Sequence, residues 1–218
     1  MGSGPMRSDA TASAWRRMLQ RLADSRPYNV LPPAHPGAQF AFADPRLIAL
    51  LPAAPRAAAV LVGLIEPEPG EYGVFLTVRA THLRHHAGQI AFPGGLIEPG
   101  DEGPAAAALR EAQEEVGLEP ARVRLLGYLP DQHVLTGFRI TPVVAQLPAD
   151  FMPRLAGAEV QASFILPFAV LLEPSTEVAG RRMVGGIEVA VRDLHYGEHR
   201  IWGATAGMLL QLRALALP

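Results

Sequence analysis

The feature that most constrains this chain is a glycine-rich loop followed by an acidic helix. The loop contains Gly94 and Gly95, and the helix, PAAAALREAQEEV, is predicted over residues 104–116. Pro104 suits the first helical position, where its missing N–H costs nothing, and Gly117 can end the helix in the left-handed conformation. At about 100° per residue, one stripe of the helix is apolar and should face a core. The residues of that stripe are Ala105, Leu109, Ala112 and Val116.

Three glutamates, Glu111, Glu114 and Glu115, lie beside the apolar stripe. Glu111 and Glu115 are four residues apart, so their carboxylates are neighbours and repel each other unless a cation joins them. An acidic helix face can simply be solvated surface, and these residues alone leave that interpretation open. The glycine loop favours a second one, because a carboxylate cluster beside a close-approaching backbone can hold a divalent ion against a phosphate-bearing substrate.

This stretch resembles the Nudix box, the signature G-x5-E-x7-R-E-U-x-E-E-x-G-U in which U is apolar. Residues 110–118 match its second half at every position. The first half is one residue longer, because Arg110 lies fifteen positions after Gly95 where the pattern has fourteen. The acid of the box is therefore Asp101 when counted from the glycine and Glu102 when counted from the arginine. We expect one of the two to pair with Arg110 and fix the loop rather than bind metal.

A second motif lies directly upstream, in FLTVRATHLRHHAGQIAFPGG (residues 75–95). On its residues alone it places Arg79, Arg84 and three histidines between a strand and the glycine loop. Such a cluster can clamp an anionic substrate through arginine–phosphate hydrogen bonds, or it can be an exposed basic loop. The stretch resembles the signature of the Nudix subfamily that cleaves coenzyme A, L-L-T-x-R-[S/A]-x3-R-x3-G-x3-F-P-G-G, and the longer box is also similar to that subfamily. Nine positions match: Thr77, Arg79, Ala80, Arg84, Gly88, Phe92, Pro93, Gly94 and Gly95.

The resemblance implies a hydrolase that splits the diphosphate of coenzyme A, or of its thioesters or oxidised forms. The products would be adenosine 3′,5′-bisphosphate and 4′-phosphopantetheine. It also implies a cofactor, Mg²⁺ or Mn²⁺, bound by Glu111, Glu114 and Glu115. Gly94 and Gly95 have no side chain, so their backbone can approach the metal and the phosphate.

The remaining site residues follow from the same resemblance. Glu111 and Glu115 are expected to be catalytic, and the base that activates water is either Glu111 or Glu159, an acidic loop residue before a later strand. Arg79 and Arg84 are expected to bind the phosphates of the substrate.

Other functions stay open beside this one. The box alone is compatible with a Nudix hydrolase of another nucleotide diphosphate, such as ADP-ribose. A non-catalytic Nudix-fold nucleotide sensor is less favoured, because this chain retains all three box glutamates. Trp202 can stack on adenine, although an aromatic residue that opens a C-terminal helix is more often part of the core.

Composition excludes several classes of protein. The chain has no cysteine, which excludes a thiol nucleophile and a cysteine-ligated zinc. Its net charge of −2 gives no sign of a nucleic-acid-binding face. No apolar run approaches about 18 residues and no secretory signal is present, so we expect a soluble, cytoplasmic protein that acts on a small molecule. All nineteen basic residues are arginines, so a side-chain cation that binds phosphate must be arginine.

The rest of the chain predicts an α/β fold, an α/β/α sandwich on a mixed sheet. Residues 1–12 are expected to be disordered, and residues 13–54 to form an amphipathic helix (13–23) and a connector packed on a Nudix domain of residues 55–218. That helix can pack on its own domain, on a partner in a homodimer, or on a membrane surface. Strands are predicted at 57–65, 72–79, 89–92, 123–129, 138–147 and 160–166, short helices at 45–51 and 167–172, a hairpin at 185–191 and 193–199, and a last helix at 204–216.

Overall fold

The computed structural model describes residues 4–23, 25, 39–40, 45–48, 50–83 and 86–218. Its helices are α1 (Gly4–Ala23), α2 (Pro45–Ile48), α3 (Pro104–Val116), α4 (Phe168–Leu172) and α5 (Gly203–Ala216). One sheet contains β1 (Gln39–Phe40), β2 (Arg56–Ile65), β3 (Gly73–Arg79), β4 (Ile90–Ala91), β5 (Gly94–Leu96), β6 (Arg124–Tyr128), β7 (Gln132–Val134), β8 (Phe138–Gln146) and β9 (Val160–Pro167). A second sheet contains β10 (Glu177–Val184), β11 (Ile187–Tyr196) and β12 (His199–Ile201).

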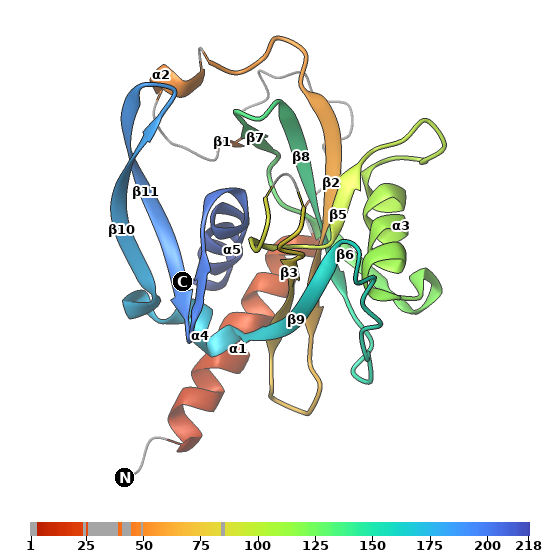
Figure 1. Ribbon diagram of the computed structural model, residues 1–218. Helices are drawn as coiled ribbons and strands as arrows, with labels where there is room; N and C mark the ends of the chain where they lie inside the picture. The colour runs from red at the N-terminus through yellow and green to blue at the C-terminus, as the bar shows by residue number, and fades with distance from the viewer. Residues whose placement is uncertain (1–3, 24, 26–38, 41–44, 49, 84–85) are drawn as a thin grey trace.

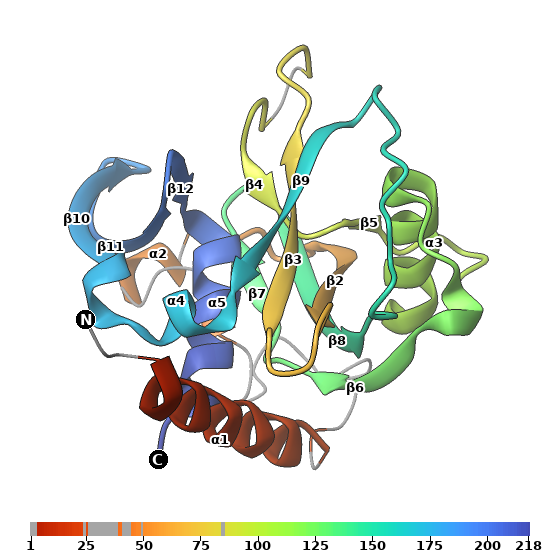
Figure 2. The same cartoon turned by 90° about the horizontal axis from the view of Figure 1, so that it is seen from below.

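The large sheet lies between two helical layers, with α3 on one face and α1, α4 and α5 on the other (Figures 1 and 2). Its strand order is β1-β7-β8-β2-β3-β4, with β5 paired to β2, β6 to β8 and β9 to β3. The sheet is mixed, because β2 is parallel to β8 and antiparallel to β3 and β5. This arrangement confirms the predicted α/β/α sandwich.

The central strand β2 is buried on both faces, which explains its almost continuous apolar sequence. Leu61 packs into the core under α3, whereas Val62 and Leu64 pack into the core shared with α1, α4 and α5. Strand β3 alternates in the same way, because Phe75 joins the α3 core and Leu76 the opposite one. Side chains at successive strand positions therefore separate the α3 side of the molecule from the α5 side.

Helix α3 has the predicted bounds but presents a different face to the core. Pro104 opens it, and Gly117 ends it in the left-handed conformation with φ 69°. Ala105 and Leu109, expected in the core stripe, are only partly buried, whereas the helix buries Ala107, Ala108, Ala112, Glu115 and Val116. The helix is turned because it packs on β5 as well as β2, so the glutamate side lies against the glycine strand. The sequence expectation treated Gly94 and Gly95 as loop, and they form β5 instead.

Helix α1 begins at Gly4, before the start predicted near Ser13. Pro5 lies in its first turn, where proline is tolerated. Trp15 is buried and stacks on Tyr72, with ring centroids 4.8 Å apart. Arg21 donates to the carbonyl of Leu217 at 2.7 Å, just past the end of α5. The helix therefore packs on its own domain, and no helix within the described ranges is long and apolar enough to cross a membrane.

The predicted hairpin at 185–191 and 193–199 is wrong, because the two turns lie elsewhere. Strands β10 and β11 are joined at Gly185 and Gly186, which have φ values of 56° and 81°. Two consecutive left-handed residues suit the two-residue hairpin turn that matches the strand twist. The second turn, between β11 and β12, contains Gly197 with φ 56°. Between the strands predicted at 123–129 and 138–147, the structure contains a further short strand, β7.

Candidate active site

The three helix glutamates differ sharply in their surroundings. The side chain of Glu115 is 4% exposed and that of Glu111 is 16% exposed, whereas that of Glu114 is 60% exposed. The carboxylates of Glu111 and Glu115 lie one helical turn apart on the side of α3 that faces β5. Of the three predicted metal ligands, the fold therefore buries Glu115, partly buries Glu111 and leaves Glu114 at the surface.

Strand β5 contacts both of these carboxylates through glycine backbone. A Cβ atom on Gly95 would lie 2.4 Å from Oε1 of Glu111, which is closer than any side chain can come. The backbone of Gly94 lies beside the carboxylate of Glu115 and lowers its pKa slightly against the effect of burial. A Cβ on Gly94 would lie 2.3 Å from the backbone carbonyl oxygen of Ala59 in β2, so only glycine fits there, whereas a Cβ on Gly95 would displace the Glu111 carboxylate. The glycine pair thus lets the backbone touch the carboxylates directly.

Burial has a large effect on the charge of these carboxylates. Loss of solvent raises the pKa of Glu115 to about 7, and the nearby charge of Arg79 opposes part of this rise. Burial likewise raises the pKa of Glu111. The negative charge of Glu159 raises the pKa of both residues further, which places this loop residue within electrostatic reach of the pair. Two ionised carboxylates in this position are therefore more stable with a bound cation between them than without one.

Arg79, at the end of β3, is the cation that the fold brings to Glu115. Its Nη1 lies 3.8 Å from Oε1 of Glu115. Its Nε is buried and has no hydrogen-bond partner among the described residues. A β-bulge between Val78 and Arg79 shifts the register with β9 at this point. A buried donor of this kind needs an acceptor, and a bound phosphate oxygen would supply one.

The other residues of the basic motif lie in the segment that follows β3. Arg84 and His85 lie outside the described residues. His82 contacts the carbonyl oxygen of Ala158 at 3.0 Å, which ties the loop after β3 to the loop that carries Glu159. His86 Nδ1 lies 2.9 Å from Oε1 of Gln89.

Asp101, and not Glu102, is the acid that pairs with Arg110. Arg110 donates through Nε to Oδ1 of Asp101 and through Nη2 to Oδ2, both at 3.2 Å. Asp101 also accepts the backbone N–H of Glu98 at 2.8 Å, and these contacts keep its pKa below the ordinary value, with the Arg110 hydrogen bond as the main cause. Glu102 is exposed. Counting from Gly95 therefore identifies the acid of the box correctly as Asp101. Its contacts with Arg110 and with the backbone of Glu98 hold the loop in place.

Arg110 also orders the glutamates, which the sequence did not indicate. Its Nη1 donates to Glu111 at 3.0 Å and to Glu114 at 3.4 Å, and its Nη2 donates to the carbonyl oxygen of Leu96 in β5 at 3.0 Å. One guanidinium thus joins the loop acid, the glycine strand and two glutamates. Glu114 is therefore occupied with Arg110 at the helix surface.

The donor set fits a hard divalent ion that is shared with a substrate. In the part of the chain that the structure describes, no three Asp, Glu, His or Cys side chains converge into a ready metal cluster. Mg²⁺ usually keeps several waters and takes only one or two carboxylates together with substrate phosphates. Glu111 and Glu115 supply two carboxylates beside a glycine backbone, so a metal completed by a diphosphate fits this arrangement.

Comparison with known proteins identifies the family to which this chain belongs. The family model for the NUDIX domain matches residues 54–184. The chain is 40% identical over 158 residues to the uncharacterized Nudix hydrolase NudL of Escherichia coli (strain K12), covering 72% of this chain and 81% of that protein. Among solved structures, the NUDIX domain of Shewanella oneidensis NrtR complexed with ADP ribose is similar with a TM-score of 0.48 and 18% identity, covering 78% of this chain and 92% of that chain. The Nudix hydrolase RenU of M. smegmatis is similar with a TM-score of 0.45 and 22% identity, covering 52% of this chain and 71% of that chain.

The family model spans the glycine strand, the acidic helix and Arg79, which faces that helix. The chain therefore belongs to the Nudix family and is a pyrophosphohydrolase.

Proposed function

We propose that this enzyme hydrolyses the diphosphate of coenzyme A, or of its thioesters or oxidised forms. The products are adenosine 3′,5′-bisphosphate and 4′-phosphopantetheine. The observation that carries the proposal is the position of Arg79, a residue of the coenzyme A motif, whose Nη1 lies 3.8 Å from Glu115 and whose Nε is buried with no partner among the described residues. The substrate class, a nucleoside diphosphate derivative, follows from the family, and the motif narrows it to coenzyme A.

The metal would be Mg²⁺ or Mn²⁺, held by Glu111 and Glu115. When bound, it supplies charge neutralisation of the diphosphate and lowers the pKa of a coordinated water. Glu114 is the third ligand that the sequence predicted, and it would have to leave Arg110 to join the other two. Two carboxylates suffice for an ion that is also coordinated by substrate phosphates.

The protein's own groups carry the rest of the chemistry. Arg79 binds a phosphate oxygen and offsets negative charge on the diphosphate. Water attacks one phosphorus as the bond from that phosphorus to the bridging oxygen breaks, and a carboxylate accepts the water proton. Glu159 is one candidate for that base and Glu111 is the other, because both lie within electrostatic reach of the buried site.

The choice of substrate is tested by comparing hydrolysis rates within one panel. Coenzyme A, an acyl-coenzyme A, dephospho-coenzyme A and ADP-ribose are each incubated with the enzyme and Mg²⁺ or Mn²⁺, and products are identified by mass spectrometry. We expect the highest kcat/KM for coenzyme A or its thioester. Equal or faster hydrolysis of ADP-ribose would overturn the coenzyme A assignment and leave the broader family activity. No hydrolysis of any compound would favour a nucleotide sensor.

A further inference from the structure

The loop that carries Glu159 is bonded to α3 at one point of its course. It spans residues 147–159, between β8 and β9. Phe151 packs into the core under α3. Further along, the N–H of Ala156 donates to the backbone carbonyl of Glu115 at 2.8 Å, which satisfies one of the carbonyls that the end of a helix leaves free. The loop is thus bonded to the same residue whose carboxylate is buried in the site.

The other end of the loop is bonded to the segment that leaves β3. The N–H of Ala80 donates to the carbonyl of Glu159 at 2.8 Å. Two residues later, Nε2 of the His82 ring lies 3.0 Å from the carbonyl oxygen of Ala158. A carbonyl oxygen can only accept, so Nε2 carries the proton in this contact. Of the two contacts, the one from His82 is made by a side chain, and a substitution can remove it without changing the backbone.

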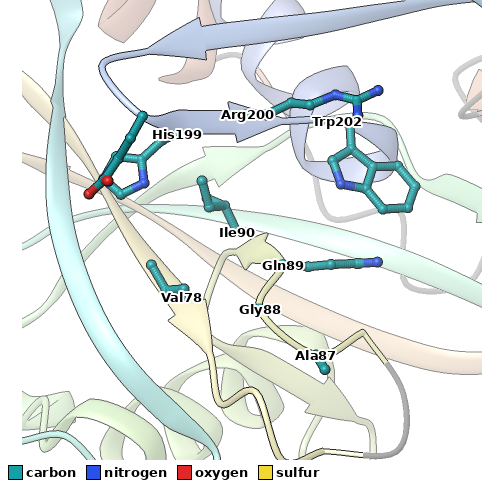
Figure 3. A pocket seen from close by; sticks show the side chains of 9 residues that line it. Val78, Ala87, Gly88, Gln89, Ile90, His199, Arg200 and Trp202 are labelled. Carbon is teal, nitrogen blue, oxygen red and sulfur yellow. The ribbon is translucent and has the colours of Figure 1, made fainter.

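The segment that leaves β3 also carries the cation of the active site. Val78 lines a pocket of about 430 Å³ together with Trp202, on the α5 side of the sheet (Figure 3). Arg79, the next residue, lies on the α3 side, with its Nη1 3.8 Å from Oε1 of Glu115. His82 follows three residues later and reaches the loop. One short segment therefore holds both the arginine and the loop in position beside Glu115.

The Glu159 side chain depends on these contacts for its position. Glu159 is exposed, yet its charge acts on both Glu111 and Glu115, whose pKa values it raises. No atom of the described residues lies within 4 Å of a Cβ added to Gly157, two positions earlier, so side-chain packing does not hold this part of the loop. The two contacts from the segment after β3 hold it instead.

We propose that His82 is a positioning residue for the hydrolytic reaction. Its hydrogen bond to Ala158 holds the loop so that the Glu159 carboxylate accepts the proton of the attacking water. The water oxygen bonds to phosphorus as the bridging oxygen leaves with its electron pair. The inference rests on the proposed function, in which Glu159 and Glu111 are the two candidate bases, and it selects Glu159. His82 itself need not touch the substrate.

Hydrogen exchange measures the position of the loop without turnover. In metal-free protein with EDTA, the peptide that covers residues 156–160 reports the N–H groups of Ala156, Glu159 and Val160, which donate to α3 and within the loop. His82→Ala should speed exchange of this peptide about fivefold, the factor expected for loss of one ordinary hydrogen bond, and should leave residues 107–113 of α3 unchanged. Exchange at 156–160 equal to that of the wild type would overturn the proposal.

A double-mutant cycle then tests whether His82 acts through Glu159. Turnover is measured at saturating Mg²⁺ on whichever diphosphate of the panel is hydrolysed fastest, so the result does not depend on the coenzyme A assignment. Glu159→Gln should lower kcat about 100-fold, at the lower end of the range for a general base. His82→Ala should lower kcat about fivefold with KM within about twofold, and should have no further effect in the Glu159→Gln background.

Two further variants complete the cycle. His82→Gln retains an N–H donor at a similar reach and should recover most of the lost turnover. His195→Ala, which removes an exposed histidine of β11, should match the wild type. An equal fall in kcat from His82→Ala in both backgrounds would overturn the proposal, as would wild-type kcat in folded His82→Ala or Glu159→Gln. If the cycle behaves as expected but ADP-ribose is hydrolysed fastest, the role of His82 stands and the coenzyme A assignment fails.

Discussion

The buried carboxylate of Glu115 should make the metal-free enzyme less stable as the pH rises. Its pKa is raised from 4.5 to about 7 by burial. Between these values the folded state holds a proton that the unfolded chain has released, so the folded state binds more protons. The free energy of unfolding therefore falls with rising pH across this interval and is lowest, for this group, above pH 7. An interval of about 2.5 pH units corresponds to roughly 3 kcal/mol.

The perturbation that isolates this effect is Glu115→Gln. Glutamine is nearly the same shape and does not titrate in this range. The stability difference, variant minus wild type, should therefore increase by about 3 kcal/mol between pH 4.5 and pH 8. Comparing the two proteins cancels the titration of groups that do not interact with Glu115, whereas Glu111, which does, contributes to the measured difference.

Urea-induced unfolding in EDTA, followed by circular dichroism at several pH values, measures the difference. Glu114→Gln is the matched control, because the Glu114 side chain is 60% exposed and its variant should track the wild type at every pH. Added Mg²⁺ should stabilise the wild type more than Glu115→Gln, since it binds the folded state through this carboxylate. A difference between Glu115→Gln and wild type that does not change with pH would refute the argument from burial.

Two further substitution pairs test the loop that surrounds this site. Gly95→Ala would place a Cβ 2.4 Å from a glutamate oxygen and should lower kcat strongly, whereas Gly100→Ala, with no atom within 4 Å of the added Cβ, should keep wild-type activity. Activity of Gly95→Ala equal to that of its control would contradict the close approach. Asp101→Ala removes the two hydrogen bonds from Arg110 and should cost about 2 kcal/mol in urea unfolding, whereas Glu102→Ala should change stability by less than about 0.5 kcal/mol. The reverse order would show that the loop acid has been misassigned.

Local signals predicted α3 well, because its ends depend on nearby residues. Pro104 and Gly117 act on the first and last turns, and the structure has the same bounds. The buried face was predicted less well, since it depends on where β5 lies. Leu109 looked like a core residue on the helical wheel, yet Glu115 is the more buried of the two. A wheel cannot show that glycines from a neighbouring strand will pack under the acidic side.

Long-range contacts account for what the sequence could not show. Because the loop has one extra residue, the sequence could not decide whether Asp101 or Glu102 pairs with Arg110. The path of the loop places Asp101 against Arg110. The Gly185-Gly186 pair is typical of a tight turn, but the strand was predicted to begin at Gly185, so the turn was missed. Gln89 and Trp202 line one pocket of about 430 Å³ although they are far apart in the sequence, so no local motif could connect them.

The most direct test of the central claim is the turnover of coenzyme A by Glu115→Gln at saturating Mg²⁺. Loss of a metal-binding carboxylate should lower kcat/KM by at least about 100-fold, more than the usual effect of removing an outer-shell partner. Glu114→Gln should stay much closer to the wild type, because Glu114 lies at the helix surface against Arg110. Circular dichroism must show that both variants are folded. A folded Glu115→Gln enzyme with wild-type turnover would contradict the assignment of Glu111 and Glu115 as the metal-binding centre.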